Sequence, residues 1–219
     1  LFADRAQNPT VLAAYDADPA LSFHQLMWNR LKTHDQRITY KTVKTLNFCR
    51  LYGGGRAKIA QMLGHITAAE FDTLKRTSSS ADHQKLRTTA AILSLYNHAM
   101  PEVSRMLATA SHAAASKGYV TTALGRRARL GTGEGFKALN RIIQGSAADV
   151  MKMKLVELHA ARKTTGFLMR FTVHDEVCGD CPSEESRRRV HEILNTQSLP
   201  LNIPIRWSVQ TGTHWGACD

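Results

Sequence analysis

The sequence predicts an α+β fold in which helices fill the first three quarters of the chain and strands are concentrated in the last quarter. Apolar residues recur with the period of a helix over most of positions 21–161. From Phe167 onward, the pattern changes to the short apolar runs that are typical of strands. Of the 219 residues, 43% are hydrophobic, which is enough to form a core. Helices followed by strands indicate part of an antiparallel sheet at one end of the molecule.

The elements of the first half are set by apolar spacing and by glycine. Apolar spacing predicts helices over 21–31 and over about 37–52. Residues 53–55 end the second helix, because three consecutive glycines favour a loop. A short helix is expected over 59–63, and the polar run 77–80 is expected to be a connection.

The second half begins with a helical stretch over 81–117, which Pro101 is expected to interrupt because proline lacks a backbone N–H. Residues 118–131 contain an extended-looking segment between glycines, which predicts a short hairpin or a loop. A broad apolar stripe predicts a helix over 134–161. We then expect strands over 167–173 and from Val177, a helix over 184–194 and a last strand over 203–210.

The charge balance indicates a polyanionic partner. The chain has 29 basic and 18 acidic residues, which give a formal net charge of +11. Nucleic acid is the usual partner of such an excess, although a generically basic protein stays open as an alternative. No window approaches 18 consecutive apolar residues, and residues 1–20 lack the apolar region of a secretory signal. We therefore expect no membrane partner.

The cysteines predict neither a disulfide framework nor a zinc site. There are four, Cys49, Cys178, Cys181 and Cys218. The spacing of Cys178 and Cys181 would suit half of a zinc site or a redox pair. A four-ligand zinc site needs two more ligands at similarly close spacing, and the other cysteines stand alone. We expect reduced thiols, which favours a cytoplasmic compartment.

The first group of residues that could bind a ligand is Lys44, Phe48 and Tyr52. Residues four apart share one face of a helix. A lysine on that face supplies a point charge for a phosphate, and the two rings supply flat surfaces for a base and sugar. Arg37 and Lys41 lie one or two turns earlier. On spacing alone, the group also fits an amphipathic helix that has two aromatic residues in the core and a solvated lysine.

The second group is His174, Asp175 and Glu176, three titratable residues between two strand-like runs. This pattern suits the tip of a hairpin that presents carboxylates to a metal, and Mg²⁺ often uses one or two carboxylates plus substrate phosphates. The alternative is a plain polar turn.

The third group, Asn140 and Gln144, shares a helix face and is followed by the small residues 145–148. The two amides could hydrogen-bond a sugar or a base edge. The small residues would allow DNA to approach closely. A close contact between this helix and a neighbouring element explains them equally well.

Taken in order, these segments resemble the polymerase domain of family A DNA polymerases. Residues 44–53 resemble that family's motif B, which lies on the mobile helix of the fingers, and residues 173–176 resemble motif C of the palm. Residues 118–127 and 140–149 match two further family blocks, and 213–215 are similar to the closing segment. The resemblance covers essentially the whole chain.

The resemblance implies a right-handed polymerase fold that is only partly present. It assigns residues 1–35 and 131–219 to the palm and residues 36–130 to the helical fingers. It also implies Mg²⁺ as the cofactor, primer–template DNA and deoxynucleoside triphosphates as partners, and the cytoplasm of a bacterium or of a phage-infected host as the location.

The resemblance also implies roles for the residues of the first group. Lys44 would contact the incoming triphosphate and stabilise charge on the leaving pyrophosphate. Phe48 would stack at the sugar and base of the nucleotide, and Tyr52 would order the insertion site. Lys41 and Arg37 are further candidates for contact with the triphosphate.

In the other two groups, Asp175 would be a ligand of the catalytic Mg²⁺ ions, with Glu176 beside it in an accessory role. Asn140, Gln144 and His174 would contact the primer–template near the growing end.

Three departures from the family pattern affect these roles. The arginine that the family usually has four residues before Lys44 is Tyr40 here, so Arg37 or Lys41 is the replacement we consider. The arginine expected four residues before Asn140 is Phe136. Motif A, with a second metal-binding aspartate, would lie just before Leu1.

We therefore expect the chain to be a fragment or one half of a split enzyme, with motif A supplied in the same chain or by another one. We expect the 219 residues alone to polymerise very poorly. A relative of the single-subunit RNA polymerases and a non-catalytic DNA-binding remnant are the alternatives.

Overall fold

The computed structural model describes residues 1–76, 84, 86–199 and 201–218. The described chain is mostly helical and contains two antiparallel sheets of two strands each, β1–β2 and β3–β4. The helices are α1 (Phe2–Ala6), α2 (Pro9–Ala17), α3 (Phe23–Lys32), α4 (Tyr40–Leu51), α5 (Arg56–Met62), α6 (Ala68–Arg76), α8 (Arg87–Ala99), α9 (Pro101–Lys117), α10 (Ala138–Ala160), α11 (Arg162–Thr165) and α12 (Glu184–Asn195). The strands are β1 (Tyr119–Thr121), β2 (Arg127–Arg129), β3 (Leu168–Val173) and β4 (Glu176–Asp180), and two short 3₁₀ helices are η1 (Gly135–Lys137) and η2 (Trp215–Ala217). The α+β class is confirmed.

The chain divides into two compact units, which are described separately. One contains residues 2–145, and the other contains residues 146–219 together with Leu1. Helix α10 contributes residues to both. The domain boundaries expected from the sequence, at 35/36 and 130/131, stay predictions. Among the helices that the structure describes, none combines the length and the apolar character that crossing a membrane requires.

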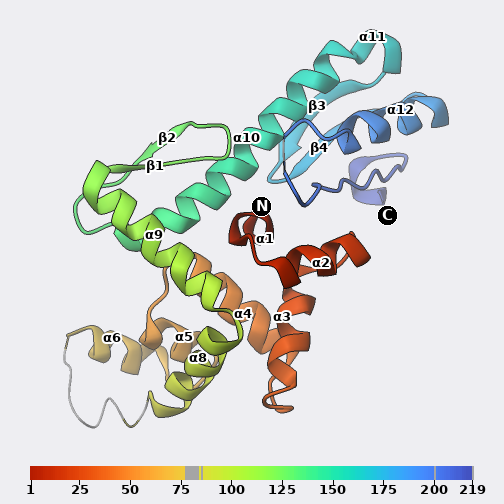
Figure 1. Ribbon diagram of the computed structural model, residues 1–219. Helices are drawn as coiled ribbons and strands as arrows, with labels where there is room; N and C mark the ends of the chain where they lie inside the picture. Colours follow the sequence, from red (N-terminus) through yellow and green to blue (C-terminus); the bar gives the residue numbers. More distant parts are fainter. Residues whose placement is uncertain (77–83, 85, 200, 219) are drawn as a thin grey trace. The chain divides into compact units, whose positions relative to one another are not determined.

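The unit of residues 2–145 is a helical assembly in which α4 packs on α3 and α5, and α8 packs on α3, α5 and α9 (Figure 1). Many of its fully buried side chains come from these helices, and Met27, Leu46, Ile59 and Tyr96 are among the largest. Helix α4 begins where it does because the hydroxyl of Thr39 accepts a hydrogen bond from the backbone N–H of Thr42. These contacts leave one face of α4 in solvent.

The hairpin β1–β2 follows α9 directly and is reached through Gly118, which has φ +71 (Figure 1). Glycine is suited to this position because residues with a Cβ rarely adopt a positive φ. The strands pair antiparallel, with Val120 opposite Ala128. The expected hairpin over 118–131 is confirmed.

The unit of residues 146–219 is built on the β3–β4 hairpin, the second half of α10 and α12 (Figure 1). Its core is formed by Leu158 of α10, Phe167, which precedes β3, and Val190 and Leu194 of α12. Trp207 of the C-terminal segment packs against this core.

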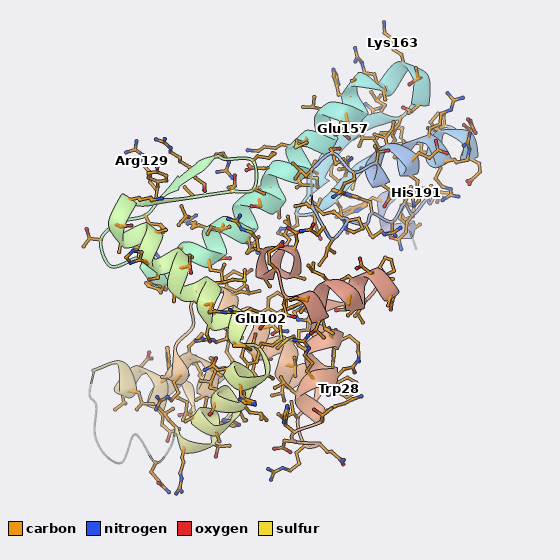
Figure 2. The ribbon with its side chains drawn as sticks, viewed as in Figure 1. Trp28, Glu102, Arg129, Glu157, Lys163 and His191 are labelled. Atoms are coloured by element: carbon orange, nitrogen blue, oxygen red, sulfur yellow. The ribbon has the colours of Figure 1, made fainter. Side chains whose placement is uncertain are left out.

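Lys154 on α10 is a buried charge that the sequence pattern did not indicate. Its side chain is 4% exposed. Its Nζ donates to the carbonyl oxygens of Ile193 and Thr196 at 3.0 and 2.6 Å, and it pairs with Glu157 at 2.8 Å (Figure 2 labels Glu157). The ammonium therefore binds backbone carbonyls at the C-terminal end of α12, where a cation is favoured.

The expected strand over 203–210 is wrong, because the structure has no strand there. The backbone of Trp207 instead bonds to a side chain. Its N–H donates to Asn195 Oδ1 at 3.0 Å, and its carbonyl accepts from Asn195 Nδ2 at 2.9 Å. Trp207 and Val209 alternate with polar residues in the sequence because they pack on the core of this unit, and not because the segment pairs with a strand.

Other expectations differ only in their bounds. The stretch 81–117 is interrupted before Pro101, as expected, and forms α8 and α9. Residues 81–83 and the connection expected over 77–80 lie outside the described residues. Helices α1, α2, α6 and α11 were not predicted.

Gly53 follows the C-terminal end of α4 and lies against the backbone of Phe136. We expect this position to tolerate no side chain. It has φ +75, and a Cβ there would lie 2.2 Å from the carbonyl oxygen of Phe136. Gly53→Ala should lower the free energy of unfolding by about 2–5 kcal/mol, since a left-handed residue costs about 1–2 and a backbone clash about 1–3 kcal/mol. Urea denaturation measures this change.

Gly64→Ala is the matched control. Gly64 has φ +77, and an added Cβ would have nothing within 4 Å. It should therefore lose only about 1–2 kcal/mol. Equal losses in the two variants would show that contact with Phe136 does not constrain Gly53.

Candidate functional site

Lys44 and Phe48 of α4 and Tyr52, which caps the C-terminal end of this helix, form one exposed face. Phe48 is 39% exposed and Tyr52 is 50% exposed. Lys44, one turn before Phe48, is also exposed. The two rings are stacked, with centroids 6.4 Å apart and an interplanar angle of 28°. Val43 and Leu46 occupy the buried side of the helix. The structure therefore leaves both rings out of the core, on a face that can receive a flat ring and an anion.

Two further candidates lie at the start of this helix. Lys41 is exposed on its first turn. Arg37 precedes the helix, and its guanidinium donates two hydrogen bonds of 3.0 Å to the carboxylate of Asp35. The hydrogen bond from Arg37 holds the pKa of Asp35 below its usual value. Arg37 is thus engaged with Asp35, and its contact with a nucleotide stays a prediction.

His24 on α3 belongs to this face and was missed by the sequence analysis. Its ring centroid lies 5.0 Å from that of Phe48, at an angle of 50°. Burial and then the charge of Lys44 lower the pKa of His24. The imidazole is therefore mainly neutral at neutral pH and adds a hydrogen-bonding group beside the lysine and the rings.

Gln144 on α10 is brought to the same face. Its Nε2 donates to the hydroxyl of Tyr52 at 3.3 Å, and the side chain is otherwise exposed. Asn140 lies one turn earlier on α10 and is partly buried. The contact of both residues with DNA stays a prediction.

Gly145 marks a close approach between α10 and the turn of the β1–β2 hairpin. A Cβ there would lie 2.8 Å from Cγ2 of Thr122 and 3.2 Å from Nη2 of Arg126. The guanidinium of Arg126 also donates to the carbonyl oxygen of Gly145 at 3.1 Å. At Gly145, the small residue therefore serves contact between elements of the protein.

The same hairpin carries exposed arginines on β2. Arg127 lies over the ring of Tyr119, 4.8 Å from its centroid. Arg129 is exposed on the same strand (Figure 2). Guanidinium groups of this kind suit phosphate contacts, because each offers several donors in a fixed plane.

His174, Asp175 and Glu176 form the tip of the β3–β4 hairpin. Val173 pairs with Glu176, so His174 and Asp175 make a two-residue turn. His174 has φ +53, a conformation that residues with a Cβ rarely adopt. All three side chains of the group are exposed. The segment is a tight polar turn that presents two adjacent carboxylates to solvent, and binding of a metal by them stays a prediction.

The donor set of this turn fits a Mg²⁺ ion that completes its shell elsewhere. Mg²⁺ prefers oxygen ligands and commonly takes one or two carboxylates together with water and phosphate oxygens. Within the described ranges, no group of three or more His, Cys, Asp or Glu side chains is placed to hold a metal. Asp175 and Glu176 would therefore supply two ligands, and the others would come from phosphate, water or further carboxylates.

Comparison with known proteins identifies relatives of one kind. The family model of DNA polymerase family A matches residues 2–217. The chain is 28% identical to a DNA polymerase of Mycobacterium phage L5 over 91% of its length, and 28% identical to a DNA-directed DNA polymerase of Pseudomonas phage M6 over 92%. It spans 31% and 32% of those two proteins.

Thermostable DNA polymerase I of Thermus filiformis is 27% identical over 80% of the chain, which spans 20% of that protein. Among solved structures, the polymerase domain of Pol1 from M. smegmatis, in complex with DNA primer–template and dNTP, shares the fold. The TM-score is 0.77 at 23% identity, over 99% of this chain and 38% of that one.

Proposed function

Because this chain belongs to DNA polymerase family A, which its match over residues 2–217 shows, we propose that the protein containing it synthesises DNA on a template. The reaction is the attack of a primer 3′-hydroxyl on the α-phosphorus of a deoxynucleoside triphosphate, with pyrophosphate as the leaving group. The observation that carries this proposal is the exposed face of α4, where Lys44, Phe48 and Tyr52 lie together. The roles proposed for these residues are those that the resemblance to the family implies.

The nucleotide site is proposed on that face. The ammonium of Lys44 binds the triphosphate and balances the charge that develops on pyrophosphate. The ring of Phe48 packs against the sugar and base, and Tyr52, held by Gln144, completes the surface. The ring of His24 packs on Phe48, close enough to Lys44 to feel its charge, and offers a neutral imidazole to the nucleotide.

The metal site is proposed at the β3–β4 turn. Asp175 and Glu176 would hold Mg²⁺ there. When bound, the ion would lower the pKa of the attacking hydroxyl and neutralise the leaving group. The chain's own contribution is to keep the two carboxylates exposed and adjacent through the turn at His174.

Primer–template DNA is the proposed macromolecular partner. The chain's net charge of +11 favours a polyanion, and such binding weakens as salt concentration rises. Asn140, Gln144 and His174 are the proposed contacts near the growing end, together with the exposed Arg127 and Arg129. The relatives come from phages and bacteria, so the proposed location is the cytoplasm of a bacterium or of a phage-infected host.

Primer extension by the full protein tests the proposal. We expect extension of a labelled primer that requires Mg²⁺, a template and the four deoxynucleoside triphosphates. Preferential use of ribonucleoside triphosphates would instead indicate an RNA polymerase. Binding of the primer–template without any extension would indicate a non-catalytic DNA-binding protein, and either result would overturn the proposal.

A further inference from the structure

A chain of three polar side chains runs beneath the exposed face of α4. The hydroxyl of Tyr96 on α8 donates to Oδ1 of Asn47 on α4 at 2.7 Å. Nδ2 of the same amide lies 2.9 Å from Nδ1 of His24 on α3. Tyr96 is 1% exposed and Asn47 is fully buried. One amide on α4 therefore joins three helices through two hydrogen bonds.

The chemistry of an amide determines the state of the histidine. The amide nitrogen of Asn47 can only donate, so Nδ1 of His24 has to accept, and the ring proton of the neutral imidazole then lies on Nε2. The Tyr96 hydroxyl favours this orientation of the amide by donating to its oxygen. Burial raises the pKa of Tyr96, so the hydroxyl keeps its proton.

The network ends at the face proposed to bind the nucleotide. The imidazole of His24 packs on the ring of Phe48, with centroids 5.0 Å apart. The charge of Lys44 is close enough to lower the pKa of His24, after burial as the larger cause. A proton fixed on Nε2 makes that nitrogen a hydrogen-bond donor, which is what an anion such as a phosphate requires, whereas the other tautomer would leave a lone pair there.

We propose that Asn47 and Tyr96 are positioning residues, which act through His24 by holding it as the Nε2–H tautomer against Phe48. This inference rests on the proposed nucleotide site, but it concerns residues that have no place on the exposed face. Asn47 and Tyr96 would thus determine how strongly a nucleoside triphosphate binds without touching it. Residues in such a network are energetically coupled, so once one link has been removed, removal of another should have little further effect.

The first test reads the tautomer directly. ¹⁵N NMR of the full protein labelled at histidine, with the His24 signals assigned by their loss in His24→Gln, reports which ring nitrogen carries the proton. We expect the proton on Nε2 without any ligand, and a mixture of tautomers in Tyr96→Phe. A proton on Nδ1 in the unaltered protein would overturn the proposal, whatever the protein's activity is.

The second test is a double-mutant cycle on nucleotide incorporation. Tyr96→Phe removes one hydroxyl group, and we expect it to raise the KM for a deoxynucleoside triphosphate about tenfold, the usual scale for one lost buried hydrogen bond, while kcat changes by less than about twofold. His24→Ala should raise KM by a similar factor, and the double variant should be no worse than His24→Ala. Tyr15→Phe, at a partly buried tyrosine of α2, is the matched control and should leave KM unchanged.

Two outcomes of the cycle would overturn the proposal. In the first, the factors by which Tyr96→Phe and His24→Ala raise KM multiply in the double variant, which means that the two residues act independently. In the second, the KM of Tyr96→Phe equals that of the Tyr15→Phe control. Thermal melting of each variant shows that the comparison is made on folded protein. Failure of the proposed nucleotide site is a separate result: it would appear as an unchanged KM in His24→Ala, while the NMR result would still stand.

Discussion

Asp175→Asn is expected to reduce nucleotide addition by the full protein at least about 10³-fold, because the amide cannot replace the charge with which a carboxylate binds Mg²⁺. Affinity for primer–template DNA should stay the same or rise, since one negative charge near the phosphates is removed. Asp175 is exposed on a turn, so the free energy of unfolding should change by less than about 0.5 kcal/mol. Single-turnover incorporation and fluorescence anisotropy with labelled DNA measure the two quantities.

Asp180→Asn is the matched control for this substitution. Asp180 lies on β4 of the same hairpin, away from the turn, and its exposed carboxylate accepts a hydrogen bond of 2.9 Å from Arg170. Its replacement removes the same charge from the same hairpin and should leave nucleotide addition nearly unchanged. If Asp175→Asn retained full turnover, Asp175 would be excluded from the metal site. Equal losses in the two variants would indicate a general effect of charge.

Lys44→Ala is expected to lower kcat/KM for nucleotide incorporation by about 10²–10³-fold, the scale found when one preorganised group is removed from a developing negative charge. Lys44→Arg should recover part of this loss, because it keeps the charge and changes the geometry. Lys44 is exposed on α4, so none of these changes should alter folding. Rapid-quench incorporation of a single nucleotide gives the rate and the apparent affinity.

Lys163→Ala, at an exposed lysine of α11, serves as the control for charge. It removes one positive charge from the chain and should weaken DNA binding slightly without a specific loss of nucleotide affinity. Similar losses of kcat/KM in both variants would mean that Lys44 acts only through net charge. The face of α4 would then no longer be supported as the nucleotide site.

The face of α4 could be predicted because it depends on one helix alone. Spacing by four residues places Lys44, Phe48 and Tyr52 together in any α-helix. That spacing does not determine which side of the helix faces solvent, because the aromatic residues could also have been buried in the core. The structure decides this through the packing of α4 on α3 and α5, which buries the side that carries Val43 and Leu46.

His24 could not be predicted, because its role depends on two helices at once. In the sequence it is a polar residue within an apolar pattern, 20 positions before Lys44. Its contact with Phe48 and its hydrogen bond to Asn47 exist only when α3 lies against α4. Contacts between elements leave little trace in local periodicity.

The wrong prediction of a strand over 203–210 has a related explanation. Alternation of apolar and polar residues reports that one side of an extended segment is buried, and it carries no information on what the backbone bonds to. Here the amide of Asn195 bonds to both backbone groups of Trp207 and takes the place of a neighbouring strand. One side chain at the end of α12 was enough to make the pattern misleading.

The buried ammonium of Lys154 has a consequence for the order in which the chain acquires its structure. The carbonyl oxygens of Ile193 and Thr196 lie 39 and 42 residues further along the chain. Until the ribosome has released that stretch, α10 carries a charge whose burial would be strongly unfavourable. The second half of α10 therefore cannot complete its packing early, and we expect residues 146–198 to become ordered together, as one cooperative step after their synthesis.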